Sequence, residues 1–423
     1  MHTIIHGDCL EELKKLDDNS VDAVITDPPY GLSNTKPKQV ADVLKAWVTG
    51  DTVSVPAKRG GFMGADWDSF VPPPAVWEEC MRVLKPGGHM AVFAGARTQD
   101  LMGLSIRLAG FEIRDTLGWI YGSGFPKSMD VSKTIDKAAG AEREVVGVGV
   151  SGKSAGMQNL GPSGIAGGEY DITAPATSEA QRWDGWGTAL KPAIEPIILA
   201  RKPLDGTVAN NVLAHGVGGL NIDACRVSTD DDTSRPPGRD GGNATWDLSS
   251  REKPSVSHSA GRFPANVLLD EHAAKEMDKQ SGWLKDRGNK RESKSTYTGG
   301  GATSFTGGGT SPLSYGAGGG ASRFFPVFKY QAKAPKKERP VIVREDGSKI
   351  QHATVKPLAL MEWLVTLITP EGGTILDPFA GTGTTLQAAT NKGFNPIGIE
   401  ADADYIQLIH QRMEGGATST RNN

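Results

Sequence analysis

The chain has few cysteines, no excess of basic residues and no long hydrophobic run. Its three cysteines in 423 residues form no CxxC pair, which argues against a disulfide framework and against a zinc site. The formal net charge of -3 excludes a generally basic nucleic-acid coat, so contacts with phosphate must come from local basic patches. No stretch approaches the ~20 apolar residues that cross a bilayer, and residues 1–4 lack the start of a signal peptide. We therefore expect reduced thiols, no metal site, no membrane contact and a cytoplasmic location.

Glycine is abundant by contrast, with 54 residues that are unevenly distributed. Gly149 to Gly168 and Gly299 to Gly320 are rich in glycine and serine, and Thr229 to Asn243 is polar. None of the three shows apolar periodicity, so we expect loops there. On both sides of this middle region apolar strands alternate with helices, which predicts a mostly parallel sheet with crossover helices.

The alternation assigns individual strands and helices. The predicted strands are Thr3–His6, Val21–Thr26, Met90–Phe93, Thr374–Leu376 and Pro396–Ile399. The predicted helices are Trp77–Leu84, Leu358–Ile368 and Thr384–Ala389. Lys85 to Gly88 contains a proline and two glycines, so we expect it to end the first of these helices.

A glycine-containing loop follows the predicted strand Thr374–Leu376 and opens a helix. Gly381 and Gly383 allow backbone to approach a ligand where a Cβ would clash. The next strand ends at Glu400, whose carboxylate can accept hydrogen bonds from both hydroxyls of a ribose. Strand, glycine loop, helix, strand and acid together predict a nucleoside site.

The same loop favours S-adenosylmethionine over NAD as the nucleoside. The dinucleotide fingerprint GxGxxG is incomplete, because Leu386 stands where its third glycine would be. Asp377, which ends the strand, would repel a pyrophosphate, whereas its charge suits a zwitterionic amino acid. An NAD-type oxidoreductase is the alternative from another class of enzyme.

A second motif, Asp27-Pro28-Pro29-Tyr30, follows the predicted strand Val21–Thr26. At the carboxyl edge of a parallel sheet such residues face the ligand crevice. The Asp27 carboxylate and the Pro28 carbonyl can each accept one N–H of an exocyclic amine, because proline leaves no competing backbone donor. Tyr30 offers a face on which a base can stack. The motif predicts methylation of an amino group on a base that has left the helix.

These two motifs, in this order, resemble those of the β-class DNA amino-methyltransferases, including phage and prophage members. The resemblance implies an α/β methyltransferase sandwich, circularly permuted, with a mostly parallel sheet and an inserted target-recognition region. It divides the chain into a catalytic half at 1–145, a recognition insertion at 146–345, a cofactor half at 346–413 and a tail at 414–423. It also implies S-adenosylmethionine as cofactor, double-stranded DNA as partner, a homodimer and a cytoplasmic location in a bacterial or phage-infected host cell.

The resemblance transfers roles to residues of this chain. The implied catalytic residues are Asp27, Pro28, Pro29 and Tyr30. The implied cofactor-binding residues are Asp8, Cys9, Leu10, Thr354, Lys356, Pro357, Asp377, Phe379, Ala380, Gly381, Gly383, Thr384 and Glu400. Ala353 departs from the family pattern, which has proline at this position and so a stiffer loop.

The first motif residue bears on the acceptor base. Relatives with Asp there mostly methylate adenine N6, whereas Ser is typical of cytosine N4. Asp27 therefore favours adenine, with a cytosine-N4 enzyme as one alternative and a catalytically silent DNA-binding relative as another.

Basic side chains mixed with aromatic ones are our candidates for DNA contacts. Residues 323–339 carry six Lys or Arg and one acid, interleaved with aromatic rings, so this strip can follow a phosphate backbone. Trp119 and Tyr121 with Lys127 form a smaller cluster that can wall a flipped-base pocket. The candidate phosphate ligands are Lys127, Arg323, Lys329 and Lys333.

Overall fold

The computed structural model describes residues 2–33, 35–56, 68–122, 128–150, 169–229, 261–283, 319–328, 340–344, 346–351 and 355–418. Its centre is a nine-stranded sheet with the order β1-β13-β12-β2-β3-β7-β4-β8-β9. These strands are β1 Thr3–His6, β13 Asn395–Glu400, β12 Thr374–Asp377, β2 Val21–Thr26, β3 Leu84–Phe93, β7 Ile194–Arg201, β4 Glu112–Ile120, β8 Val267–Asp270 and β9 Val327–Phe328. β7 runs antiparallel to both of its neighbours, and all other pairs are parallel. The prediction of a mostly parallel α/β sheet is confirmed.

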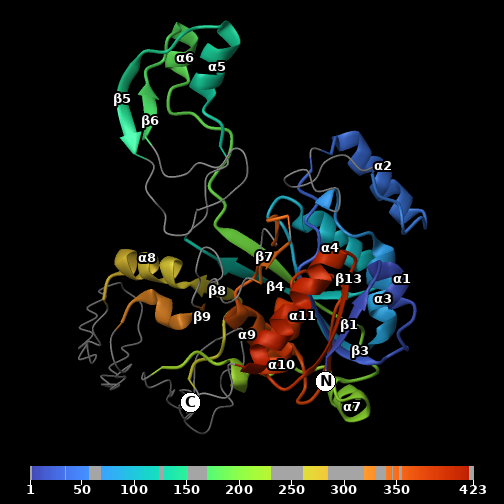
Figure 1. Cartoon of the computed structure of the whole chain (residues 1–423). Helices are drawn as coiled ribbons and strands as arrows, with labels where there is room; N and C mark the ends of the chain where they lie inside the picture. The colour runs from blue at the N-terminus through green and yellow to red at the C-terminus, as the bar shows by residue number, and fades with distance from the viewer. Residues whose placement is uncertain are drawn as a thin grey trace, which may run out of the picture.

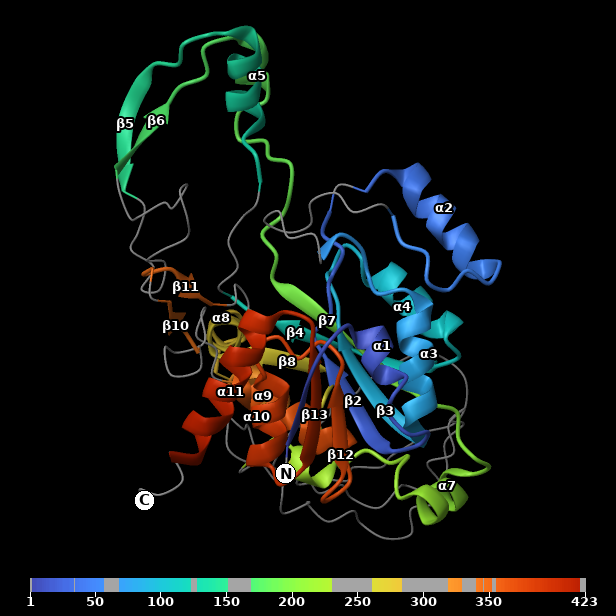
Figure 2. The ribbon, with the colours of Figure 1, turned by 45° about the vertical axis from the view of Figure 1, so that its right-hand side comes forward.

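Helices cover both faces of the sheet (Figure 2). On one face lie α1 Cys9–Leu13, α2 Pro37–Val48, α3 Pro74–Val83 and α4 Gln99–Leu108. On the other lie α9 Leu358–Ile368, α10 Thr384–Asn391 and α11 Ala403–Thr418. Each face of the sheet has a hydrophobic core, the first core on the side of α1–α4 and the second core on the side of α9. Strand residues alternate between these cores, since Met90 packs in the first core and Ala91 in the second. β2 is therefore buried on both faces and is apolar at most of its positions.

The sequence-based elements agree well with these bounds, and α9 matches its predicted range at both ends. The segment from Lys85 to Gly88 is an exception, because we expected it to separate a helix from a strand. It belongs instead to β3, where the pairing register with β2 shifts. Gly87 takes a positive φ of 77° there, and a Cβ on it would lie 2.3 Å from the Asn211 side chain. Pro86, Gly87 and Gly88 therefore form an irregular first part of β3 and do not separate it from α3.

Three strands of the central sheet, β7, β8 and β9, come from residues 146–345. A small lobe stands apart from the sheet (Figure 1). It consists of α5 Val131–Ala139, β5 Val145–Val150, β6 Glu169–Thr173 and α6 Ser178–Arg182. The remaining described elements are α7 Val208–His215, η3 Asp223–Cys225, α8 Glu271–Ser281, η4 Ala321–Phe324, β10 Ile342–Val343 and β11 Lys349–Ile350. Most of the predicted glycine-rich loops lie outside the described residues. Among the helices that are described, none has the length and apolar character needed to cross a membrane.

Candidate active site

The two sequence motifs meet at one edge of the sheet, although about 350 residues separate them in the chain. β12 and β2 are neighbouring parallel strands, with Leu376 opposite Val24. Their carboxyl ends therefore lie side by side, and the Thr26 hydroxyl donates a 2.7 Å hydrogen bond to Oδ1 of Asp377. Asp27 and the loop after Asp377 consequently face one region, which is where parallel α/β sheets bind ligands.

Asp27 is the centre of a cluster of polar side chains. Tyr30 donates its hydroxyl to Oδ1 of Asp27 at 2.8 Å. The Lys356 ammonium, which enters just before α9, lies 2.7 Å from Oδ2 of Asp27 and 3.0 Å from the Tyr30 hydroxyl oxygen. Lys356 also lies over the rings of Tyr30 and Phe93, at 5.3 and 4.9 Å from their centroids. Both carboxylate oxygens of Asp27 are thus held by side chains.

The protonation states in this cluster follow from burial and charge. Burial, together with the nearby carboxylate of Asp27, raises the pKa of Tyr30 well above its usual value. Burial alone would lower the pKa of Lys356, but the carboxylates of Asp27 and Glu195 outweigh it and raise this pKa above the usual range. Near neutral pH, Tyr30 is therefore a neutral hydroxyl and Lys356 carries a positive charge.

The backbone after the two prolines is held in place from two sides. Oδ1 of the buried Asp68 accepts the N–H groups of Tyr30 at 2.7 Å and Gly31 at 2.9 Å. The Thr98 hydroxyl donates to the Tyr30 carbonyl at 2.6 Å. Gly31 has a φ of 67°, and a Cβ there would lie 2.8 Å from the backbone nitrogen of Val71. The loop 27–31 is therefore held in one conformation, and glycine is required at its end.

The glycine-containing loop after β12 is also held by hydrogen bonds. Oε2 of Glu400 accepts the backbone N–H of Gly381 at 2.7 Å. The buried Arg412 of α11 donates from Nε to the Thr382 carbonyl at 2.6 Å. Gly381 and Gly383 have positive φ values of 53° and 76°, so the glycines allow the sharp turn into α10.

Carboxylates at this edge are partly withdrawn from water. Asp377 is 2% exposed, and burial raises its pKa to about 6, although hydrogen bonds from Thr385, Thr26 and the Phe379 N–H oppose the rise. Burial likewise raises the pKa of Glu400. Low solvent exposure strengthens the attraction of such groups for a cationic ligand.

The other predicted cofactor residues lie along the same edge. Asp8 follows β1, the neighbour of β13, and caps α1 by accepting the N–H groups of Leu10 and Glu11. Cys9 and Leu10 pack against the first core, and burial raises the pKa of Cys9 to about 12. The remaining members are Phe379, whose ring centroid lies 6.4 Å from that of Trp77, Ala380 and Thr384, both buried, and Pro357, the N-cap of α9. Thr354 lies outside the described residues.

The predicted DNA contacts are less closely grouped. Arg323 lies on η4, next to β9, which is five strands away from β2 and therefore roughly 24 Å from it at the usual strand spacing. Its guanidinium stacks 4.9 Å from the Phe324 ring centroid. Trp119 is 1% exposed and packs with Phe328 in the second core, so it is not available to a base. Lys127, Lys329 and Lys333 lie outside the described residues.

Three residues with clear roles at this edge, Asp68, Glu195 and Arg412, were absent from the sequence-based prediction. Each lies far in the chain from the residue that it holds, and none belongs to a short motif. Glu195 is the second residue of β7, and its Oε2 lies 3.3 Å from the Lys356 ammonium. The only feature of the sequence that marked Glu195 was its position just before the apolar run 197–200.

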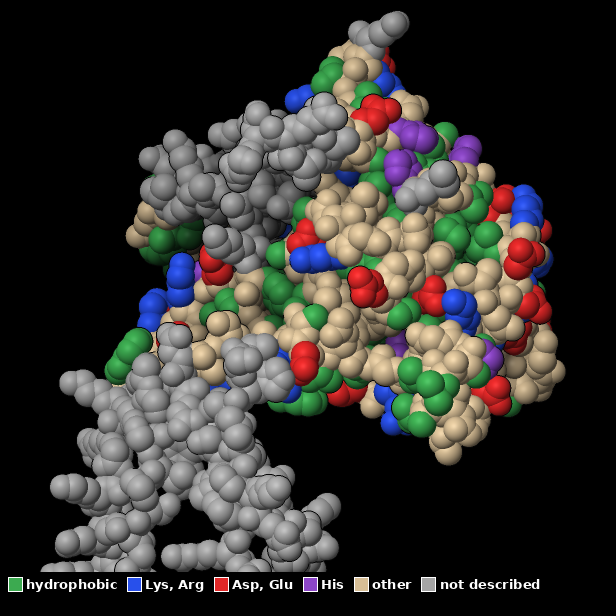
Figure 3. Space-filling model, turned by 90° about the horizontal axis from the view of Figure 1, so that it is seen from below, with side chains coloured by type: hydrophobic (Ala, Val, Ile, Leu, Met, Phe, Trp, Pro, Cys, Tyr) green, Lys and Arg blue, Asp and Glu red, His purple; other side chains and the backbone are tan. Residues whose placement is uncertain are grey.

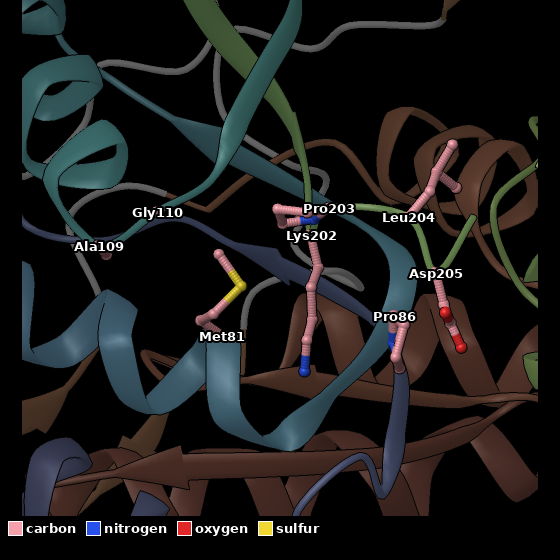
Figure 4. Close-up of a pocket in the computed structure, with 8 residues that line it drawn as sticks. All are labelled: Met81, Pro86, Ala109, Gly110, Lys202, Pro203, Leu204 and Asp205. Carbon is pink, nitrogen blue, oxygen red and sulfur yellow. The ribbon is translucent and has the colours of Figure 1, made fainter. Parts of the chain in front are cut away.

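The opposite edge of the sheet has a different character. An open hollow of about 540 Å³ lies there, lined by Met81, Pro86, Ala109, Gly110, Lys202, Pro203, Leu204 and Asp205 (Figure 4). The Lys202 ammonium in it donates to Oδ1 of Asn19 and to the Leu84 carbonyl. On this side of the molecule, acidic and basic side chains are interspersed over the coloured part of the surface (Figure 3). The hollow offers no concentrated charge to a ligand.

Comparison with known proteins gives consistent matches. The model of the N6_N4_Mtase family, described as DNA methylase, matches residues 21–411. Type II methyltransferase M.HindIII of Haemophilus influenzae is 22% identical over 426 residues, covering 97% of this chain and 94% of that protein. DNA adenine methyltransferase YhdJ of Escherichia coli is 35% identical over 121 residues, covering 29% of this chain and 34% of that protein. Among solved structures, the M1.HpyAVI–SAM complex is similar with a TM-score of 0.38 and 15% identity, over 98% of this chain and 99% of that chain.

Proposed function

The chain belongs to the N6/N4 DNA methylase family, and we propose that it methylates the N6 amino group of adenine in double-stranded DNA. It is a DNA methyltransferase with S-adenosylmethionine as methyl donor. The family match covers residues 21–411, and it excludes the alternative of an NAD-type oxidoreductase. The choice of adenine, the site residues, the recognition role of residues 146–345 and the homodimer are parts of the proposal.

The side chains at the cofactor edge fit this methyl donor chemically. Carboxylates stand at the ends of three adjacent strands, as Glu400, Asp377 and Asp27. Glu400 suits the ribose hydroxyls, and Asp377 suits the ammonium of the methionine portion. When bound, S-adenosylmethionine supplies an electrophilic methyl group on a sulfonium.

Asp27 and Pro28 bind the amino group that receives the methyl. An ionised carboxylate has about four lone-pair sites, so Asp27 can accept an amine N–H in addition to the hydroxyl of Tyr30. The Pro28 carbonyl accepts the second N–H. Holding both protons turns the nitrogen lone pair away from the ring and toward the methyl group. The rigid loop fixed by Asp68 and Thr98 maintains this orientation, so catalysis depends on positioning and needs no covalent enzyme intermediate.

The observation that carries the adenine assignment is the carboxylate of Asp27 at the first position of the motif. Its hydrogen bonds to Tyr30 and Lys356 fix it in place at the end of β2. The adenine activity of the relative from E. coli supports the same choice.

The assignment is tested by incubating purified protein with mixed-sequence DNA and methyl-labelled S-adenosylmethionine, then digesting the DNA to nucleosides for mass spectrometry. We expect labelled N6-methyladenine. Labelled N4-methylcytosine would overturn the adenine assignment and leave the family intact. Absence of label in any nucleoside would instead support a catalytically silent DNA-binding relative.

A further inference from the structure

Glu195 lies beside the catalytic cluster without belonging to either motif. β7 is the antiparallel strand of the sheet, so its first residues lie at the edge where its parallel neighbours end. Glu195 pairs with Trp119 near the end of β4, while Ile197 pairs with Phe93 at the end of β3. This register places Glu195 at the same edge of the sheet as Asp27.

The Lys356 ammonium is shared by two carboxylates. It lies 2.7 Å from Oδ2 of Asp27 and 3.3 Å from Oε2 of Glu195. The side chain of Lys356 is 11% exposed, and those of Asp27 and Glu195 are 25% and 27% exposed. The ammonium is thus buried between two acids that are still partly open to an incoming ligand.

The charges of Asp27, Glu195 and Lys356 show what the second acid contributes. Asp27 and Glu195 carry two negative charges and Lys356 one positive charge. A sulfonium bound beside these three side chains would bring their total to zero. The total would stay zero as the N–CH3 bond forms and the S–CH3 bond breaks, and the cationic methylated amine would then release one N–H proton to water. Without Glu195, Asp27 would be the carboxylate partner left to the ammonium among the described residues, and the ammonium would neutralise the group that must bind the amine.

We propose that Glu195 is a positioning residue for methyl transfer, which receives the Lys356 ammonium when the amino group of the target base binds to Asp27. Glu195 acts through Lys356 and does not touch the reacting atoms. In the free enzyme the ammonium favours Asp27, and entry of the amine transfers it toward Glu195. Asp27 is then released to accept the amine N–H without an unpaired buried cation being left behind.

The inference rests on DNA methyl transfer by the wild-type protein and holds equally for adenine N6 and cytosine N4. It is tested by measuring total methyl label incorporated into DNA, whichever base carries it, under single-turnover conditions. A wild-type protein without activity would contradict the proposed function, whereas the role of Glu195 is judged from the variants relative to an active wild type.

The variants form a cycle of Glu195→Gln, Lys356→Met and the double variant, with Glu276→Gln as a control. Glu276 is an exposed carboxylate on α8 that also pairs with a lysine, at 2.6 Å. We expect Glu195→Gln to lower the transfer rate about tenfold or more, the scale of a misplaced catalytic group, with KM for S-adenosylmethionine changed less than about threefold. The double variant should transfer at the rate of Lys356→Met alone, and Glu276→Gln at the wild-type rate.

Two results would overturn the inference. One is a wild-type rate in Glu195→Gln. The other is a full multiplicative loss in the double variant, because independent effects would mean that Glu195 does not act through Lys356. If Lys356→Met transfers too slowly to measure, or Glu195→Gln melts below the wild type, Glu195→Asp decides. The retained carboxylate should recover most of the lost rate, and a rate as low as that of Glu195→Gln contradicts the proposal.

Discussion

Asp22 and Asp27 occupy opposite ends of β2 and are held in different ways. Asp22 accepts the Lys85 ammonium at 2.6 Å and the backbone N–H of Thr374 at 2.7 Å. Asp27 is held by the Tyr30 hydroxyl and the Lys356 ammonium, both of which belong to side chains. A backbone donor cannot leave without disrupting β12, whereas a side chain can move when a ligand arrives. Asp22 therefore stabilises the sheet, while Asp27 remains able to exchange partners.

The largest effect should follow from Asp27→Asn. The amide keeps the volume but replaces one acceptor oxygen with a donor, so it opposes the amine N–H and loses the charge that attracts Lys356. We expect the rate of methyl transfer to fall about 10³-fold or more, while DNA binding and the melting temperature stay close to wild type. The check is single-turnover transfer of labelled methyl, alongside a gel-shift titration. Residual activity above a tenth of the wild-type rate would remove Asp27 from the centre of the mechanism.

A smaller loss of transfer rate is expected when the loop 27–31 loses its hydrogen bonds. Asp68→Ala removes the acceptor for the N–H groups of Tyr30 and Gly31, so Asp27 and Pro28 lose their fixed orientation. We expect kcat to fall about 10²-fold, the cost of misplacing a reacting group by about 1 Å, with KM for S-adenosylmethionine nearly unchanged. Steady-state kinetics with Ser69→Ala as a neighbouring control measure this. Equal changes in kcat and in cofactor affinity would point to general disorder instead.

The comparison extends to Asp377, which is buried like Asp22 but lies at the end of β12 where we propose that the cofactor binds. Burial raises its pKa to about 6, so the carboxylate is mostly protonated at pH 5 and mostly ionised at pH 7. Because only the ionised form attracts the ammonium of the methionine portion, affinity for S-adenosylmethionine should rise about tenfold from pH 5 to pH 7. Calorimetric titration across this range measures the change. Asp377→Asn should bind weakly and remove most of the pH dependence; a retained slope would assign it to another group.

Asp22→Asn should affect activity least. Lys85 loses its ion pair, and we expect the free energy of unfolding to fall by about 1–2 kcal/mol, the cost of a lost charged hydrogen bond. The transfer rate measured below the melting temperature should stay within about twofold of wild type. A large loss of rate without a loss of stability would mean that the two ends of β2 are not functionally distinct.

The sequence predicted the parts of this molecule that depend on neighbouring residues. Apolar runs identified β2 and β12, helical spacing identified α9, and short motifs located Asp27 and the glycine loop. The place of Asp27 at the carboxyl edge of the sheet was also predicted, because it follows an apolar strand of a mostly parallel sheet. Each of these features is encoded within about ten residues.

The features that escaped prediction depend on contacts between distant segments. Asp68 reaches Tyr30 across 38 residues, and Lys356 reaches Asp27 across 329. Lys356 was expected at the cofactor, and the structure shows its bond to Asp27, a pairing that no spacing in the chain encodes. Glu195 contacts Lys356 only because β7 enters the sheet antiparallel, which its apolar pattern could not reveal.

Sequencing of DNA methylated by the purified protein with single-molecule long reads tests the central claim most directly. Wild-type protein and Asp27→Asn should be compared on the same unmethylated DNA. We predict N6-methyladenine at one recurrent sequence with the wild type and none with Asp27→Asn. N4-methylcytosine at the recurrent sequence, or methylation that persists in Asp27→Asn, would contradict the account.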